Sequence, residues 1–269
     1  MCELLAMSGA VPEQLDLSLQ ILASHGDAQH GTNDGWGAAY YQGNDVALFR
    51  EAQGAGSSQL LAFLQTHGPA TNIAISHIRR ATMGARCLAN TQPFVRTLAG
   101  RAHTFAHNGN LAEIASKYCN PAWDCAFQML GETDSERAFS YLLFLMQQVW
   151  LQAVPTMLQR VQVFRQFCTE MRELGPANFV YSDGEFLFVH AHKRIQREAG
   201  IIAPPGLWIL ERHCPMISAA PEIDPNMKRD VTLVASVPLT QEAWRPLEES
   251  EILVLYNGKP LLLPSFLAP

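Results

Sequence analysis

The chain begins MCELLAMSG (residues 1–9), a cysteine directly behind the initiator methionine and then an apolar run. The stretch CELLAMSG (2–9) predicts a β-strand. Removal of Met1 would make Cys2 the N-terminal residue, with a thiol and a free α-amine that can serve as nucleophile and base. Most cysteines are small buried hydrophobic residues, so this stretch alone does not decide between the two interpretations.

The composition is that of an ordinary globular protein. With 269 residues and 48% hydrophobic content, the chain is long enough for one large or two small domains, and 9% aromatic and 16% charged residues exclude a disordered or coiled-coil chain. A net charge of −6 provides no basic surface for nucleic acid. No apolar run is long enough to predict a membrane span, and Glu3 interrupts the only N-terminal one, so no signal peptide is expected.

Cysteine and histidine spacing predicts neither disulfides nor a metal site. The six cysteines contain no Cys-x-x-Cys pair, which is typical of reduced, cytoplasmic thiols: Cys2, Cys87, Cys119, Cys125, Cys168 and Cys214. The nine histidines follow no metal-binding spacing, and the Gly-x-Gly at Gly54 and Gly56 lacks the third glycine of a dinucleotide fingerprint. We therefore expect no metal and no cofactor.

The hydrophobic pattern predicts strands, then two helices, then strands again. Early strands are expected over 2–9, 35–41, 46–52, 72–82 and 103–107, with helices over 15–25 and 57–67. TDSE (133–136) has the spacing of a capping box and should begin a long helix, and a second helix should run from about Pro155 to Gly175. Later strands are expected over 178–182, 185–191, 206–211, 231–236 and 251–257. This order, without a Pro/Gly-rich linker, predicts one α+β domain with mixed or antiparallel sheets.

Two adjacent arginines end the strand predicted over 72–82, in SHIRRAT (76–82). Neighbouring residues on a strand point to opposite faces, so at most one of Arg79 and Arg80 can enter a given pocket. Taken alone, the segment favours a strand end with solvated charges. The alternative is a guanidinium that binds a carboxylate through two parallel hydrogen bonds.

The segment HNGN (107–110) also has two interpretations. Asn-Gly is the preferred dipeptide of a tight type I′ hairpin turn. Alternatively, the Asn108 side-chain amide and the Gly109 backbone N–H converge as the two donors of an oxyanion hole.

The segment ETDSE (132–136) places Asp134 in the first turn of the predicted helix. There it complements the helix dipole, or it accepts hydrogen bonds from a substrate ammonium group. A nucleophile with its own base, an oxyanion hole, a carboxylate receptor and an ammonium receptor together complement one molecule, an amino acid with a side-chain amide. Glutamine fits this description.

The ordered set of Cys2, HIRRAT (77–82), HNGN (107–110) and ETDSE (132–136) resembles the class II, or N-terminal nucleophile, glutamine amidotransferases. The resemblance is nearest to short stand-alone members without a synthase domain, a group that includes γ-glutamyl amide hydrolases. It implies an α+β fold with two antiparallel sheets between helix layers, a four-layer αββα sandwich, over a single domain of residues 1–269. It also extends to YSDGE (181–185) and VASVPLTQEAWRPL (234–247).

The resemblance assigns a role to each motif residue. Cys2 is the nucleophile, Asn108 and Gly109 form the oxyanion hole, and substrate binding falls to Arg79, Thr82 and Asp134. Met83 and Gln92 depart from the pattern, since several family members have histidine there, and both positions are expected near the substrate. The loop NDGWG (33–37) differs from the Arg-Gly loop of synthase-linked members but resembles the corresponding loop of the short subfamily.

Three functions compete at this point. The first is a glutaminase that passes ammonia to a separate partner protein, or a plain hydrolase of γ-glutamyl amides that releases ammonia or an amine. The second is a catalytically silent protein of the same fold that binds glutamine or scaffolds a complex. The third is an acylase for another amide, which Arg79 and Asp134 disfavour because such substrates lack an amino-acid head group. Family members often form dimers, so a homodimer stays open, and neither nucleic acid nor membrane is an expected partner.

Overall fold

The computed structural model describes residues 2–15, 34–81, 84–119, 126–196, 199–215 and 228–263. Most of the helix expected over 15–25 and both Thr82 and Met83 lie outside the described residues.

The larger sheet has seven antiparallel strands in the order β13-β11-β12-β1-β4-β2-β3. The strand that begins at the chain's N-terminal end, β1, lies in its centre, between β12 and β4. The strands are β1 (Glu3–Glu13), β2 (Gly35–Gln42), β3 (Asp45–Glu51), β4 (Thr71–Arg79), β11 (Trp208–Pro215), β12 (Lys228–Ala235) and β13 (Arg245–Pro246).

The smaller sheet has six antiparallel strands in the order β15-β14-β8-β7-β6-β5. These are β5 (Phe94–Leu98), β6 (Arg101–Gly109), β7 (Ala177–Ser182), β8 (Leu187–His190), β14 (Ile252–Tyr256) and β15 (Lys259–Pro260). A short hairpin of β9 (Arg194–Ile195) and β10 (Ile202–Ala203) stands beside them.

The described helices are α2 (Gln59–His67), α3 (Ile114–Lys117), α5 (Asp134–Trp150) and α6 (Met157–Arg172), with short 3-10 turns η2 (Ala55–Ser57) and η3 (Leu88–Asn90). The predicted start of α5 is confirmed, because the Thr133 hydroxyl accepts the N–H of Glu136 at 3.2 Å. The second bond of a capping box, in which the Glu136 side chain would accept the N–H of Thr133, is a wrong prediction. The Glu136 carboxylate instead accepts the N–H groups of Leu130 and Gly131 and pairs with Arg96.

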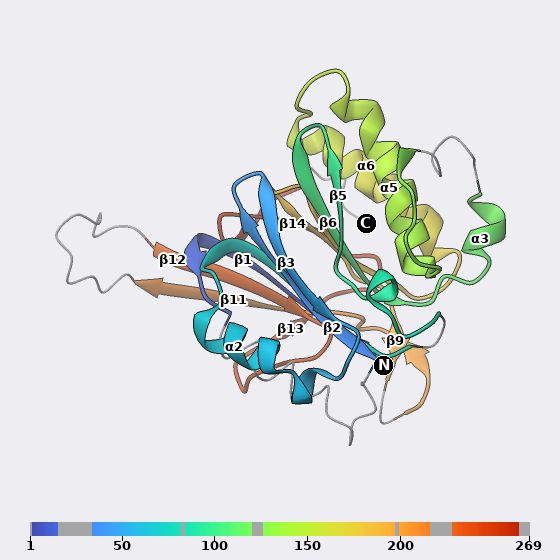
Figure 1. Ribbon diagram of the computed structural model, residues 1–269. Helices are drawn as coiled ribbons and strands as arrows, with labels where there is room; N and C mark the ends of the chain where they lie inside the picture. The colour runs from blue at the N-terminus through green and yellow to red at the C-terminus, as the bar shows by residue number, and fades with distance from the viewer. Residues whose placement is uncertain are drawn as a thin grey trace.

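The sheets and helices stack in four layers (Figure 1). Helix α2 packs on the outer face of the seven-stranded sheet through Leu61 and Leu64. Helices α5 and α6 cover the outer face of the six-stranded sheet (Figure 1). Between the sheets lies a third apolar layer of mostly aliphatic side chains. This is the predicted α+β, αββα sandwich.

The two-residue period of the strands determines which side chains enter the space between the sheets. On β1, Leu4 and Ala6 belong to the middle layer, whereas Leu5 and Met7 pack on the α2 side. Cys2 continues the even-numbered series, so the start of β1 directs it toward the end of the middle layer. Among the described residues, no helix is long and apolar enough to cross a membrane.

Candidate active site

Cys2 lies at the end of the sandwich, beside the last residues of β4. Glu3 of β1 pairs with Ile78 of β4. This register places Cys2 beside Arg79 and Arg80, the two residues that follow Ile78. The Cys2 Sγ is 3.1 Å from the N–H nitrogen of Arg80 and 3.2 Å from its carbonyl oxygen. The side chain is half-buried.

The surroundings of Cys2 favour the protonated thiol. Burial raises its pKa, and this effect outweighs the Arg80 N–H, the chain's N-terminal charge and the Arg79 guanidinium, all of which lower the pKa, whereas Asp134 raises it. A neutral thiol is a weak nucleophile, so this cysteine needs a base to become reactive at neutral pH.

The two arginines of SHIRRAT have opposite environments, as the strand alternation predicts. Arg79 is buried, and its guanidinium donates to the carbonyl oxygens of Gly84 and Ala85, both at 3.2 Å. Arg80 is exposed. The interpretation as a strand end with solvated charges is therefore wrong for Arg79 and correct for Arg80.

Asn108 approaches Cys2 from the other sheet. Its side-chain amide donates to the carbonyl oxygen of Cys2 and to the Ser236 hydroxyl, each at 2.8 Å. Ser236 also accepts the N–H of Leu4 at 3.1 Å. The family resemblance covers the segment 234–247, but it assigns Ser236 no role, and a lone serine at a strand end carries no chemical signal of its own.

The hairpin-turn interpretation of HNGN is wrong, because Asn108 and Gly109 are the last residues of β6 and pair with Asn178 and Ala177. The glycine is required here for lack of space, since a Cβ at this position would lie 1.8 Å from the carbonyl oxygen of Pro176.

The direction of the Gly109 N–H follows from the ladder. Asn110 donates to Pro176 at 3.2 Å, and hydrogen-bonded and non-hydrogen-bonded pairs alternate along antiparallel strands. The N–H of Gly109 therefore points away from β7, to the side where the Gln92 side chain accepts the N–H of His107 at 2.6 Å. Gln92 is buried, and its side chain supports the main chain of β6. The sequence predicted that Gln92 lies near the substrate but not that it has this structural role.

Asp134 is the first residue of α5, which places it at the positive end of that helix. Its carboxylate accepts the N–H of Leu111 and the N–H of Ser135, each at 2.8 Å. These two bonds orient the carboxylate between the end of β6 and the helix. The side chain remains half-buried, so it is open to a further donor.

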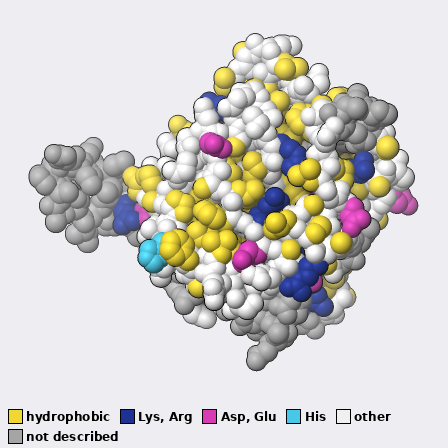
Figure 2. All heavy atoms as spheres, in the orientation of Figure 1, with side chains coloured by type: hydrophobic (Ala, Val, Ile, Leu, Met, Phe, Trp, Pro, Cys, Tyr) yellow, Lys and Arg dark blue, Asp and Glu magenta, His cyan; other side chains and the backbone are white. Residues whose placement is uncertain are grey.

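The Arg79 guanidinium lowers the pKa of the Cys2 thiol and the Asp134 carboxylate raises it, so charges of both signs act on this group. Figure 2 shows that Lys and Arg side chains are scattered among hydrophobic and other side chains on the visible face. A zwitterionic amino-acid head group carries the complementary pair of charges. Of the predicted site residues, the structure brings Cys2, Arg79, Asn108, Gly109 and Asp134 to this end of the sandwich; Thr82 is outside the described residues.

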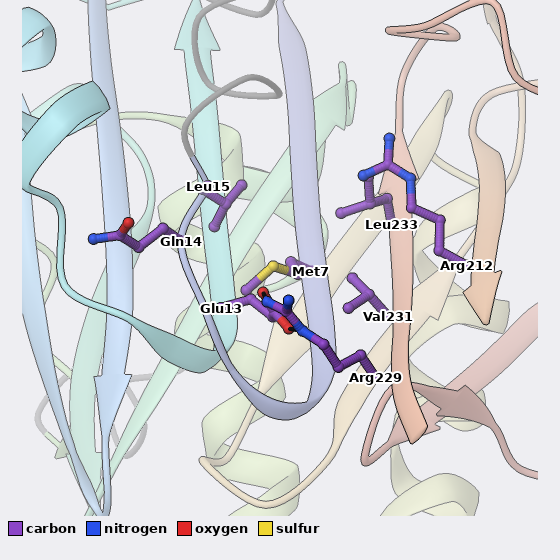
Figure 3. A pocket seen from close by; sticks show the side chains of 8 residues that line it. All are labelled: Met7, Glu13, Gln14, Leu15, Arg212, Arg229, Val231 and Leu233. Atoms are coloured by element: carbon purple, nitrogen blue, oxygen red, sulfur yellow. Dashed lines mark hydrogen bonds and ion pairs between the residues drawn. The ribbon is translucent and has the colours of Figure 1, made fainter. Parts of the chain in front are cut away.

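A cavity of about 220 Å³ lies elsewhere, on the outer face of the seven-stranded sheet (Figure 3). Its two arginines already pair with carboxylates, Arg229 with Glu13 and Arg212 with Glu242. A second cavity of about 300 Å³ is lined in part by Ser236, the residue whose hydroxyl accepts from Asn108. In the part of the chain that the structure describes, no group of three or more His, Cys, Asp or Glu residues could hold a metal ion.

Comparison with protein families gives a match over residues 1–266 to the family described as "Glutamine amidotransferases class-II". The chain is 32% identical over 255 residues to "Putative glutamine amidotransferase YafJ" of Escherichia coli (strain K12), covering 93% of this chain and 96% of that protein. It is also 29% identical over 262 residues to the protein MJ1515 of Methanocaldococcus jannaschii, covering 96% of this chain and 70% of that one.

Solved structures share the fold. The crystal structure of a "predicted glutamine amidotransferase" from Pseudomonas aeruginosa PA01 is 28% identical, has a TM-score of 0.66 and covers 97% of this chain and all of that one. Glutamine phosphoribosylpyrophosphate amidotransferase from B. subtilis has a TM-score of 0.59 at 16% identity, a likeness of fold alone, and the chain spans 48% of its length.

Proposed function

Since this chain belongs to the class II glutamine amidotransferases, we propose that it cleaves the side-chain amide of glutamine, or of a γ-glutamyl amide, through a thioester on Cys2. The observation that carries the proposal is the convergence of the two sheets on this residue. The Asn108 amide from one sheet reaches the Cys2 main chain of the other at 2.8 Å, with Arg79 and Asp134 acting on the same thiol.

In the proposed reaction, removal of Met1 frees the α-amine of Cys2. The thiol proton passes to this amine while the sulfur forms a bond to the amide carbon. In unfolded peptides a thiol has a pKa of about 8.5 and an α-amine one of about 7.7–8.0, so this exchange is easy near neutral pH. Burial, which raises the pKa of the Cys2 thiol, makes such a nearby base necessary.

The oxyanion that then forms is proposed to accept from the Asn108 side-chain amide, which exchanges one of its bonds to Cys2 and Ser236 for this one, and from the Gly109 N–H. The proton on the amine passes to the leaving nitrogen as the carbon–nitrogen bond breaks. Water next adds to the glutamyl thioester and releases glutamate and the free thiol. The amino-acid head group of the substrate is proposed to lie with its carboxylate on Arg79 and its ammonium on Asp134.

The largest predicted effect is that of Cys2→Ser, which should lower glutaminase turnover by at least about 10³-fold because the hydroxyl is a far weaker nucleophile. Binding of glutamine, measured by calorimetry, should stay within about threefold of the original value. Intact-mass spectrometry should show active protein without Met1, and a glutamine-analogue electrophile should modify Cys2. Full activity in protein that retains Met1 would disprove the mechanism.

A further inference from the structure

The main chain of Arg80 is in direct contact with the Cys2 sulfur. Its N–H nitrogen lies 3.1 Å from Sγ and its carbonyl oxygen 3.2 Å from the same atom. A thiol can use both contacts, since S–H donates to the carbonyl and the sulfur accepts from the N–H. A thiolate has no proton to donate, so the N–H is the contact that remains and strengthens when the thiol ionises.

Asp34 holds the backbone on both sides of Arg80. Its own N–H donates to the carbonyl oxygen of Arg79 at 3.3 Å, and its carboxylate accepts the N–H of Ala81 at 2.8 Å. The first bond is made by the peptide unit that carries the Arg80 N–H, and the second by the next unit, which carries the Arg80 carbonyl.

Asp34 is itself anchored by the start of β2. Gly35 pairs with Arg79 in the sheet, and a side chain there would lie only 2.9 Å from the hydroxyl oxygen of Thr91. The residue next to Asp34 therefore packs too closely against Thr91 to carry a side chain. Strand β4 ends at Arg79, so within the described part of the chain residues 80–81 have no neighbouring strand to bond to. The Asp34 carboxylate accepts the N–H of Ala81 instead.

We propose that the Arg80 main-chain N–H donates to the Cys2 sulfur as the thiolate forms, and that Asp34 is the positioning residue that holds this donor in place. The step changes no bond at Arg80: the proton leaves the sulfur for the α-amine, and the electron pair left on the sulfur is stabilised by the N–H. The role in turnover rests on the proposed function, whereas the effect on thiol reactivity does not.

Three other charges face the thiol: the Arg79 guanidinium from β4, the Asp134 carboxylate from α5 and the N-terminal amine. The bonds described above join Asp34 to the main chain rather than to any of these charges. Asp34→Asn keeps an oxygen that accepts the Ala81 N–H and removes only the charge. Asp34→Ala removes the acceptor. This pair of variants separates positioning from charge.

The test is the pH dependence of Cys2 alkylation by iodoacetamide in protein that lacks Met1, followed on the N-terminal peptide by mass spectrometry. Asp34→Ala should raise the apparent pKa of the thiol by about 0.5–1 unit, which lowers the alkylation rate at pH 7 by roughly 3–10-fold. Asp34→Asn should stay within about twofold of the original rate. An unchanged titration in Asp34→Ala, or equal shifts in both variants, would overturn the proposal.

A second pair removes the donor itself. Arg80→Pro has no N–H, whereas Arg80→Ala keeps it and loses only the exposed side chain. If Arg80→Pro folds by circular dichroism, its thiol should titrate higher than that of Arg80→Ala, and an equal titration would contradict the assignment. If it does not fold, the Asp34 pair decides.

With active protein, Asp34→Ala should lower kcat and leave KM nearly unchanged. If the original chain hydrolyses neither glutamine nor a set of γ-glutamyl amides, the proposed function fails while the alkylation result still stands.

Discussion

The two faces of the six-stranded sheet are built from different kinds of side chain, although they alternate along the same strands. On the face under α5 and α6, Phe105 stacks on Phe139 with ring centroids 5.2 Å apart, and Phe179 lies 5.5 Å from Phe105. On the opposite face, β6 carries Ala106 and then Asn108. Large apolar contacts therefore support one face, and the polar contacts of the candidate site lie at the end of the other. Stability and chemistry are separated by one residue along one strand.

The strongest test of this separation is Phe105→Ala. Removing a fully buried ring should lower the free energy of unfolding by about 3–5 kcal/mol, because the surrounding rings leave a cavity. Urea unfolding measures the loss. At a temperature where the variant stays folded, its kcat should remain within about threefold. Phe63→Ala, on the exposed face of α2, is the control and should change stability by less than about 0.5 kcal/mol. A large loss of kcat in folded Phe105→Ala would show that the two faces are not independent.

Asn108→Ala tests the other face. Loss of one oxyanion donor should lower kcat by about 10²–10³-fold, or about 2.7–4 kcal/mol of transition-state stabilisation. Steady-state kinetics with glutamine measures it, and Asn44→Ala, exposed in the turn between β2 and β3, is the matched control. A kcat within threefold of the original would remove Asn108 from the proposed mechanism.

The smallest expected effect is the change of unfolding free energy with pH, which tests two buried histidines on the helix-covered face. Burial lowers the pKa of His103 and of His190 to about 3. The unfolded chain binds protons at these residues below about pH 6.5, whereas the folded chain stays neutral. The stability that depends on these neutral histidines is present above pH 6.5 and decreases as the pH falls below it, by about 1 kcal/mol for each histidine between pH 7.0 and 5.5. Denaturant unfolding at pH 7.0 and 5.5 measures this loss, and equal stabilities would show that the histidines ionise in the folded state.

Particular residues show how far local sequence patterns predict the structure and why they stop there. Thr133 is predicted as a helix cap because capping is a local property, and the structure confirms it; the predicted partner of Glu136 is wrong because its carboxylate pairs with the distant Arg96. HNGN is compatible with a hairpin turn by local propensity alone. Pairing of β6 with β7, about seventy residues away, overrides that preference.

Two polar residues at the site lie in segments of the family resemblance, NDGWG (33–37) and VASVPLTQEAWRPL (234–247), but nothing local gives either of them a role. Ser236 matters because β12 pairs with β1 and brings its hydroxyl to Asn108, 128 residues away. Asp34 matters because β2 pairs with β4 and brings its carboxylate to Ala81. Neither residue belongs to a sequence motif whose chemistry alone would indicate its contacts.

The sequence by itself determined the kinds of groups available: a cysteine behind the initiator methionine, an arginine on a buried strand, an Asn-Gly pair and an aspartate at a helix start. The two-residue strand period, the helical period and the cap at Thr133 also determined most strands and both long helices, and they indicated that Arg79 and Arg80 point to opposite faces of the sheet. Only the tertiary structure decided that Asn108 would touch Cys2 and that Arg80 would present its N–H to the sulfur. These contacts join strands that are distant in sequence, and register between such strands is a property of the packed sheets rather than of any one segment.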